Sequence, residues 1–160
     1  MKSIVSNIVI AITGSDASIM AAKYAIIMAK TYHCRLSVVY VVDIATIKQL
    51  ALSRIFVQEE SVEYEKSLTA NGERYLSFVE ELAHAKGVKI EKELRRGAVY
   101  TEILTAADER KADLIILGGW EKERSARDIL GHAHREIMIG AKCSVLLVKE
   151  PNIDQMYKHL

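Results

Sequence analysis

The sequence is poor in cysteine and lacks any Cys-x-x-Cys pair. Its two cysteines, Cys34 and Cys143, stand far apart in a chain of 160 residues, so no metal or redox motif is indicated. Each cysteine is expected to pack as a small apolar residue. A reducing environment is the simplest interpretation, and we therefore predict a cytoplasmic protein.

Neither an excess of one charge nor a long apolar run is present. The chain has 22 basic and 21 acidic residues and a formal net charge of +1. This balance argues against general binding to nucleic acid or to a membrane surface, both of which favour a basic face. The apolar run in MKSIVSNIVIAITGSD is too short to span a bilayer and has no small-residue cleavage pattern. We interpret it as a buried strand.

The chain length fits one domain that can bury roughly 70% of its unfolded surface. No internal repeat, low-complexity segment or linker interrupts it. Continuous apolar runs, typical of strands buried on both faces of a parallel sheet, occur at residues 7–12, 36–42, 113–117 and 144–148. Residues 88–94 (VKIEKEL) alternate apolar and charged side chains, which indicates a half-exposed edge strand.

Helical patterns separate these strands. We expect helices at about residues 16–30, 60–86, 99–110 and 131–139, the first capped by Ser15 or Asp16. Alternating strands and helices predict a parallel α/β sheet with right-handed crossovers. In such folds ligands bind beyond the carboxyl ends of the strands.

Two segments are harder to assign. Residues 44–58 have partial helical spacing without a clear cap, and form either a short helix or a lid-like crossover. The apolar face of residues 47–57 could cover the cleft, serve a partner or extend a dimer contact; we favour packing over the sheet, because large exposed apolar patches are rare in monomers. The polar tail after Pro151 is expected to be loosely held.

Four pieces of the chain together resemble the universal stress protein family: IAITGSDASIMAAKYAIIMAK, VVYVVD, ADLIILGG and ILGHAHREIMIGAKCSVLLVK. The resemblance implies one universal stress protein domain at residues 7–150, followed by a C-terminal tail at 151–160. It also implies a five-stranded parallel sheet with helices on both faces, strand order 3-2-1-4-5, of the adenine-nucleotide alpha-hydrolase-like type. A homodimer paired through Ser144–Val148 is implied as well, which would cover an otherwise unpaired apolar edge.

Members of the family either bind ATP or lack the glycines that hold its phosphates. In the ATP-binding motif, Gly118 matches the first glycine and Gly131 the third. The second glycine falls on Glu121, and the serine or threonine after the third falls on His132. The aspartate after the first strand falls on Thr13. The motif is therefore degraded at three positions.

Each departure weakens a phosphate site. Glutamate is disfavoured at positive φ, its Cβ crowds the backbone, and its charge repels a polyphosphate by roughly 1 to 4 kcal/mol at 4 Å. His132 replaces a small hydroxyl donor, although a protonated imidazole could still donate. Thr13 accepts a ribose hydrogen bond less strongly than a carboxylate does.

A nucleotide could still bind in another geometry. Lys122, Arg124 and Arg127 are basic, and Gly131 precedes a helix whose N-terminus favours anions. The adenine contact of the family maps to the end of the second strand. This alternative site would be formed by Thr13, Val41, Gly118, Gly119, Gly131, His132 and Ala133.

No catalytic or metal constellation is indicated. His132 and His134 lie two residues apart on a helix and point in different directions, and no Ser-His-Asp or Cys-His arrangement follows from the spacing. We predict a non-enzymatic regulatory protein, a homodimer that binds a protein partner without a cofactor. A nucleotide-binding module for ATP or AMP is the alternative, and a slow ATP hydrolase is a third.

Overall fold

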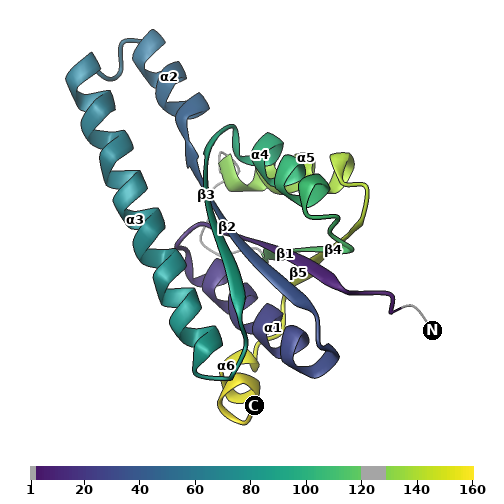
Figure 1. Cartoon of the computed structure of the whole chain (residues 1–160). Helices are drawn as coiled ribbons and strands as arrows, with labels where there is room; N and C mark the ends of the chain where they lie inside the picture. The colour runs from purple at the N-terminus through teal and green to yellow at the C-terminus, as the bar shows by residue number, and fades with distance from the viewer. Residues whose placement is uncertain (1–2, 120–128) are drawn as a thin grey trace.

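The computed structural model describes residues 3–119 and 129–160, with no description of the side chains of residues 129 and 130. Five parallel strands form one sheet in the order β3-β2-β1-β4-β5 (Figure 1), which confirms the order that the family resemblance implied. The strands are β1 (Asn7–Ile12), β2 (Arg35–Asp43), β3 (Ile90–Gly97), β4 (Leu114–Gly118) and β5 (Ser144–Val148).

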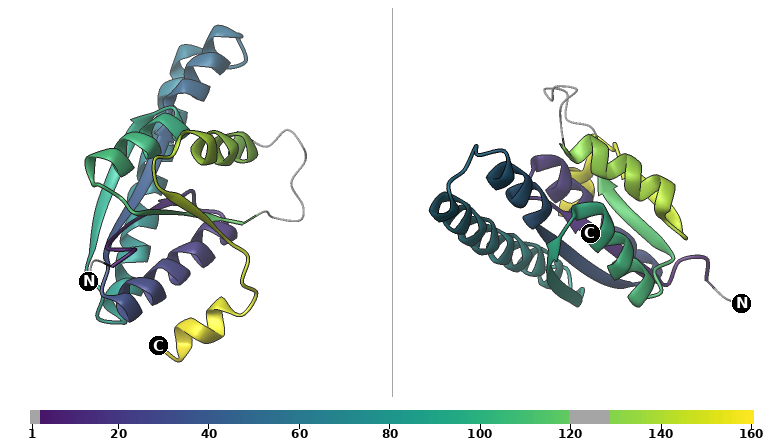
Figure 2. Two further views of the ribbon diagram at one scale, coloured as in Figure 1. Left: turned by 90° about the vertical axis from the view of Figure 1, so that its right-hand side faces the viewer. Right: turned by 90° about the horizontal axis from the view of Figure 1, so that it is seen from above.

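Helices cover both faces of the sheet (Figure 2). They are α1 (Asp16–Tyr32), α2 (Ile44–Leu52), α3 (Gln58–His84), α4 (Val99–Glu109), α5 (Ile129–Gly140) and α6 (Ile153–Lys158). Side chains of α1, α3 and α6 join the core on one face, and side chains of α4 and α5 join the core on the other. No helix in these described parts of the chain combines the length and the apolar character that crossing a membrane requires.

The central strand shows why its sequence is apolar throughout. Successive side chains point to opposite faces of a strand. Ile8 and Ile10 therefore join the core under α1 and α3, while Val9 joins the core under α4 and α5. The edge strand β3 is mostly half-buried or exposed, as its alternating sequence predicted.

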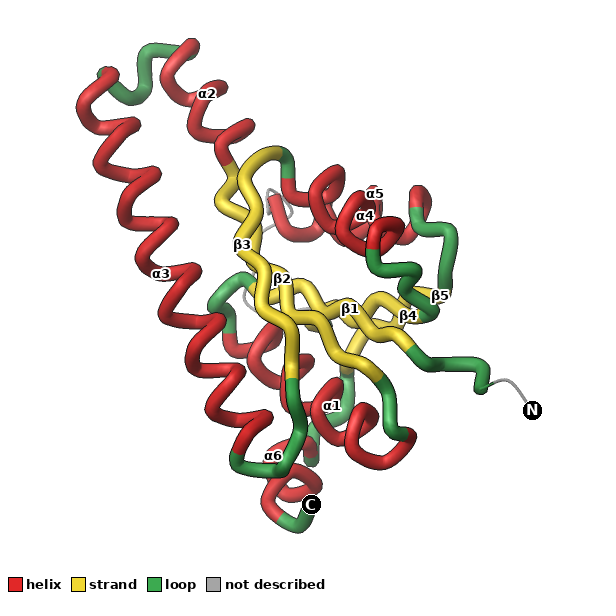
Figure 3. Tube along the Cα trace, in the orientation of Figure 1, coloured by secondary structure: helices red, strands yellow, loops and turns green. Residues whose placement is uncertain are grey.

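The segment after β2 is helical and has a cap. Asp43 accepts a hydrogen bond from the backbone N–H of Thr46 at 3.0 Å and from its hydroxyl at 2.7 Å, which satisfies the start of α2. We expected this segment to pack over the sheet, and that expectation is wrong. Only Ile47 is buried in α2, and the helix lies against the N-terminal half of α3 (Figure 3).

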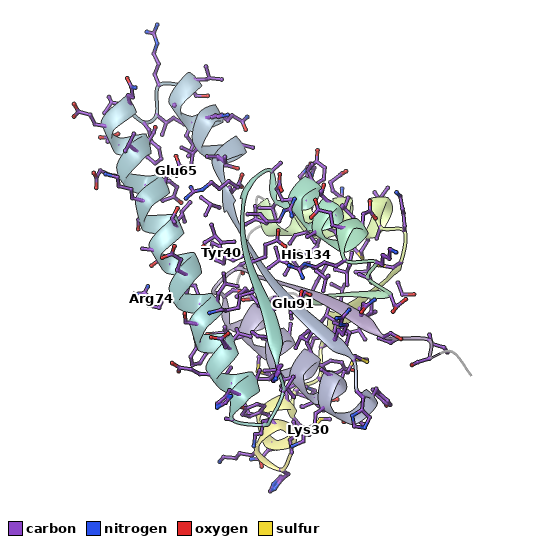
Figure 4. All side chains as sticks on the ribbon, in the orientation of Figure 1. Lys30, Tyr40, Glu65, Arg74, Glu91 and His134 are labelled. Atoms are coloured by element: carbon purple, nitrogen blue, oxygen red, sulfur yellow. The ribbon has the colours of Figure 1, made fainter. Side chains whose placement is uncertain are left out.

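A glycine within α3 allows the helix to approach the sheet closely. A Cβ atom at Gly72 would lie 2.5 Å from the ring of Tyr40, whose side chain projects from β2 toward α3 (Figure 4). The Tyr40 ring in turn stacks on Tyr75 of α3, with centroids 6.4 Å apart. Close packing therefore compensates for the low helix propensity of this glycine.

We expected the C-terminal segment to be loosely held, and that expectation is wrong. It forms α6, where Ile153 is fully buried in the core beside α1. The hydroxyl of Tyr157 donates a hydrogen bond to the carbonyl of Leu82 at 2.6 Å, and Lys23 of α1 pairs with Asp154 at 2.7 Å. One buried isoleucine and one tyrosine hydroxyl thus attach a segment whose composition is otherwise polar.

Candidate functional site

The carboxyl ends of the parallel strands meet at one edge of the sheet, as expected for a ligand site. Thr13 directly follows β1, Val41 lies near the end of β2, and Gly118 ends β4. Gly119 follows β4, while Gly131, His132 and Ala133 lie in the first two turns of α5. Glu121, Lys122, Arg124 and Arg127 lie outside the described residues.

Hydroxyl groups connect the turn between β1 and α1. The hydroxyls of Thr13 and Ser15 lie 3.0 Å apart. The Ser15 hydroxyl also caps α1 by accepting the N–H of Ser18 at 3.2 Å. The Ser18 hydroxyl accepts the N–H of Thr13 at 3.2 Å and donates to the carbonyl of Ser15 at 2.9 Å. The Thr13 hydroxyl is therefore engaged within its own turn.

The two glycines at the end of β4 are explained by packing. A Cβ atom at Gly118 would lie 2.8 Å from the backbone of Ala17 at the start of α1. A Cβ atom at Gly119 would collide with the carbonyl oxygen of Val148 in β5. Both positions exclude larger residues whether or not a phosphate binds, so the glycines do not by themselves indicate a nucleotide site.

The start of α5 is attached to β4 by His134. Its Nε2 lies 2.8 Å from the carbonyl oxygen of Gly118, and because a carbonyl can only accept, Nε2 carries the proton. Its Nδ1 is buried and has no partner among the described atoms. From the sequence we expected only that His134 lies on a helix and points away from His132. No local pattern indicates a contact with a residue of a different element.

The other residues of this helix start face different surroundings. The His132 ring is exposed and lies edge-on to Tyr100 of α4, with centroids 6.3 Å apart. The side chain of Ala133 is buried in the core, so only its backbone could meet a ligand. Val41 is half-buried in the core under α4.

The described residues offer no obvious catalytic or metal chemistry at this edge. Asp43 is occupied by Thr46, as described above. Among residues 3–119 and 129–160 no group of three or more His, Cys, Asp or Glu side chains is arranged to hold a metal ion. The thiols of Cys34 and Cys143 are both free, and burial raises the pKa of each above its ordinary value.

The sheet order and the helices on both faces define a parallel α/β domain, and sequence comparison gives its family. The family model of the universal stress protein family matches residues 5–149, so the chain belongs to that family. Universal stress protein MJ0531 of Methanocaldococcus jannaschii is 35% identical over 151 residues, which cover 94% of this chain and 85% of that protein.

Solved structures share the fold at lower identity. A universal stress protein family member from Burkholderia pseudomallei is 23% identical, with a TM-score of 0.72 over 94% of this chain and all of that one. A universal stress protein in complex with cAMP is 22% identical, with a TM-score of 0.67 over 92% and 99% of the two chains. The Archaeoglobus fulgidus universal stress protein in complex with dAMP is 20% identical, with a TM-score of 0.58 over 92% and 100%.

Proposed function

We propose that this universal stress protein is a regulatory protein of the cytoplasm that acts as a homodimer by binding a protein partner. It neither catalyses a reaction nor holds ATP tightly. The observation that carries the proposal is at Thr13, where the family motif has aspartate. The Thr13 hydroxyl lies 3.0 Å from the Ser15 hydroxyl, so a ribose would meet no carboxylate there, only a hydroxyl that already shares a hydrogen bond within its own turn.

The start of α5 supports the same conclusion. The motif has a small hydroxyl residue where this chain has His132, and that ring lies against Tyr100. Glu121 adds a negative charge at the position of the second motif glycine, which opposes a triphosphate. The two free thiols are consistent with a reducing compartment.

The homodimer would form through β5, paired antiparallel to its mate. This strand is an edge of the sheet, and its sequence SVLLV carries no charge. Val145, Leu146 and Leu147 are only half-buried. An unpaired apolar edge of this kind favours pairing with another chain.

A nucleoside monophosphate is the second candidate ligand, because two proteins of this fold are described in complex with cAMP and dAMP. One phosphate carries less charge than three and is therefore repelled less by Glu121. Gly131→Val should abolish such binding by blocking backbone approach at the start of α5. Equal affinity of wild-type and variant for AMP would place the ligand elsewhere.

Equilibrium dialysis with ATP and magnesium tests the proposal through Glu121. The wild-type protein should bind with a dissociation constant of about 1 mM or weaker. Glu121→Gly removes both the charge and the Cβ atom, and should strengthen binding at least tenfold, whereas the matched Glu121→Gln removes the charge alone. Micromolar binding by the wild type would contradict the proposal. If neither variant gains affinity, the carboxylate is not what excludes the phosphates.

A further inference from the structure

The helical hairpin of α2 and α3 extends beyond the carboxyl edge of the sheet. Figures 1 and 3 show α2 and the N-terminal half of α3 side by side, with the turn between them far from α4 and α5. The body of the domain therefore leaves the hairpin tip, defined as residues 52–63, accessible. A second molecule could contact this tip without meeting the rest of the domain.

Large aliphatic side chains cover the hairpin tip. Leu52 is 85% exposed, Ile55 64%, Val57 60% and Val62 46%. The neighbouring Phe56 of the turn contacts Tyr64 of α3 edge-on with centroids 5.5 Å apart, so this ring packs the turn against α3 while the aliphatic side chains stay exposed. Exposed apolar clusters of this kind mark interaction sites.

Charges of opposite sign flank the aliphatic side chains. Arg54 is exposed in the turn, whereas Glu59 and Glu63 are exposed one turn apart on α3. No ion pair within the described part of the chain involves any of these three. Glu60 differs from them, because its carboxylate accepts the backbone N–H of Val57 at 3.2 Å and caps α3. The tip therefore carries a basic side chain in its turn and acidic side chains at the start of α3, together with exposed aliphatic side chains.

We propose that the hairpin tip is a contact between two copies of this chain. In a two-fold contact the same patch meets itself, so the basic turn of each copy can face the acidic start of α3 in the other. Arg54 of each copy then pairs with Glu59 and Glu63 of its mate, and Leu52, Ile55 and Val57 pack at the centre. A patch with a single sign of charge would repel itself in this arrangement.

The charges favour a second copy over a membrane surface. Insertion of an apolar tip into an anionic bilayer is assisted by flanking basic residues. Here Glu59 and Glu63 stand beside the aliphatic side chains and oppose such binding. The tip contact is separate from β5, so pairing at both places would build assemblies larger than a dimer.

Sedimentation velocity of the full chain tests the tip contact in a Val145→Lys background, which is designed to block pairing at β5. This protein should still form a dimer as its concentration rises to about 100 µM. The double variant Leu52→Glu, Ile55→Glu should remain a monomer of 17.9 kDa. Phe78→Glu, at an exposed position of α3 outside the tip, is the matched control and should still dimerise.

Exchanging the charges of the tip distinguishes the two-fold contact from non-specific hydrophobic association. Two variants are made in the same background: the single variant Arg54→Glu, and the double variant Glu59→Arg, Glu63→Arg. Each should weaken dimerisation about tenfold on its own, because each places like charges together. An equimolar mixture of the two variants should restore it, because every charge then meets its opposite. Circular dichroism of each variant verifies that the domain is folded.

Three outcomes would overturn the proposal. The first is a Val145→Lys protein that stays monomeric at every concentration. The second is a mixture that dimerises no better than its separate variants. The third is tip-dependent co-sedimentation with vesicles of phosphatidylcholine and phosphatidylglycerol by a chain that does not self-associate, since this would assign the tip to a membrane.

Discussion

The two edge strands of the sheet, β3 and β5, differ in the chemistry of their side chains. On β3, Glu91, Glu93 and Arg95 lie among charged side chains of α4 and its C-terminal end. Arg95 contacts Glu93 at 2.5 Å and Glu102 at 2.7 Å, while Arg110 contacts Glu91 and lies 2.8 Å from Glu93. In contrast, β5 consists of one serine and four aliphatic residues.

Because of this difference, β3 should resist pairing with a strand of another chain, whereas β5 should allow it. Charged side chains and a long covering helix discourage a strand from pairing with another chain. β3 has both, because its other face lies under α3 and Lys92 there pairs with Glu80 at 3.0 Å. β5 is the other edge of the sheet among the described residues and carries no charged side chain, which supports the assignment of the proposed homodimer to it.

The largest predicted effect is on assembly through β5. Val145→Lys places a charge on a half-buried edge position, where lysine opposes strand pairing. In dilute solution the wild type should have about twice the chain mass of 17.9 kDa, and the variant should have the mass of one chain. Light scattering coupled to size-exclusion chromatography measures both. Lys92→Ala on β3 is the control, and a change in its mass would show that the edges do not differ as described.

The next effect is on stability at β3. Glu93 accepts hydrogen bonds from Arg95 and Arg110, so Glu93→Gln removes a carboxylate shared by two guanidinium groups. We expect the free energy of unfolding to fall by about 2 kcal/mol, measured by urea denaturation. Glu80→Gln, at the more exposed pair on the other face, should cost less. If both variants lost the same free energy of unfolding, the carboxylate shared by two guanidinium groups would contribute no more than the exposed pair.

Acid should weaken the same cluster. Burial alone would raise the pKa of Glu93, but hydrogen bonds from Arg110 and Arg95 outweigh burial and hold it below its ordinary value of 4.5. A carboxyl whose pKa is lower in the folded state stabilises the protein above the unfolded pKa, and this contribution is lost as pH falls through the folded pKa. The stability difference between wild type and Glu93→Gln should therefore shrink below about pH 4.5. If this stability difference did not change with pH, the contribution of Glu93 would not be electrostatic.

The smallest effect should come from the exposed ion pair on β3. Lys92→Ala removes the contact with Glu80, whose side chain is 48% exposed. Surface pairs of this kind contribute roughly 0 to 1 kcal/mol, so the urea midpoint should move little. A loss as large as that of Glu93→Gln would show that both faces of the edge strand depend on charge.

The sheet was predictable because its signals are local. NIVIAI, LSVVYVV and SVLLV are continuous apolar runs with turn or helix signals beside them, and the spacing alone indicated parallel strands. The strand order came from the family resemblance. The cap on α1 was also predictable, since Ser15 directly precedes a helical pattern.

The missed features depend on contacts between distant residues. The burial of Ile153 depends on a space beside α1, which no pattern around residue 153 reveals. The contact between His134 and Gly118 joins two elements, as does the contact of Arg110 with β3. The protruding hairpin was missed because an apolar helix beside a strand end usually covers the sheet, whereas α2 covers α3.

The proposed function depends most directly on the absence of tight ATP binding. Calorimetric titration of the wild-type protein with ATP and magnesium, after removal of any bound nucleotide, measures it. We predict no saturable heat below a ligand concentration of about 1 mM. A stoichiometric isotherm with a micromolar dissociation constant would show that Thr13, Glu121 and His132 still permit a triphosphate to bind, and would contradict the proposal.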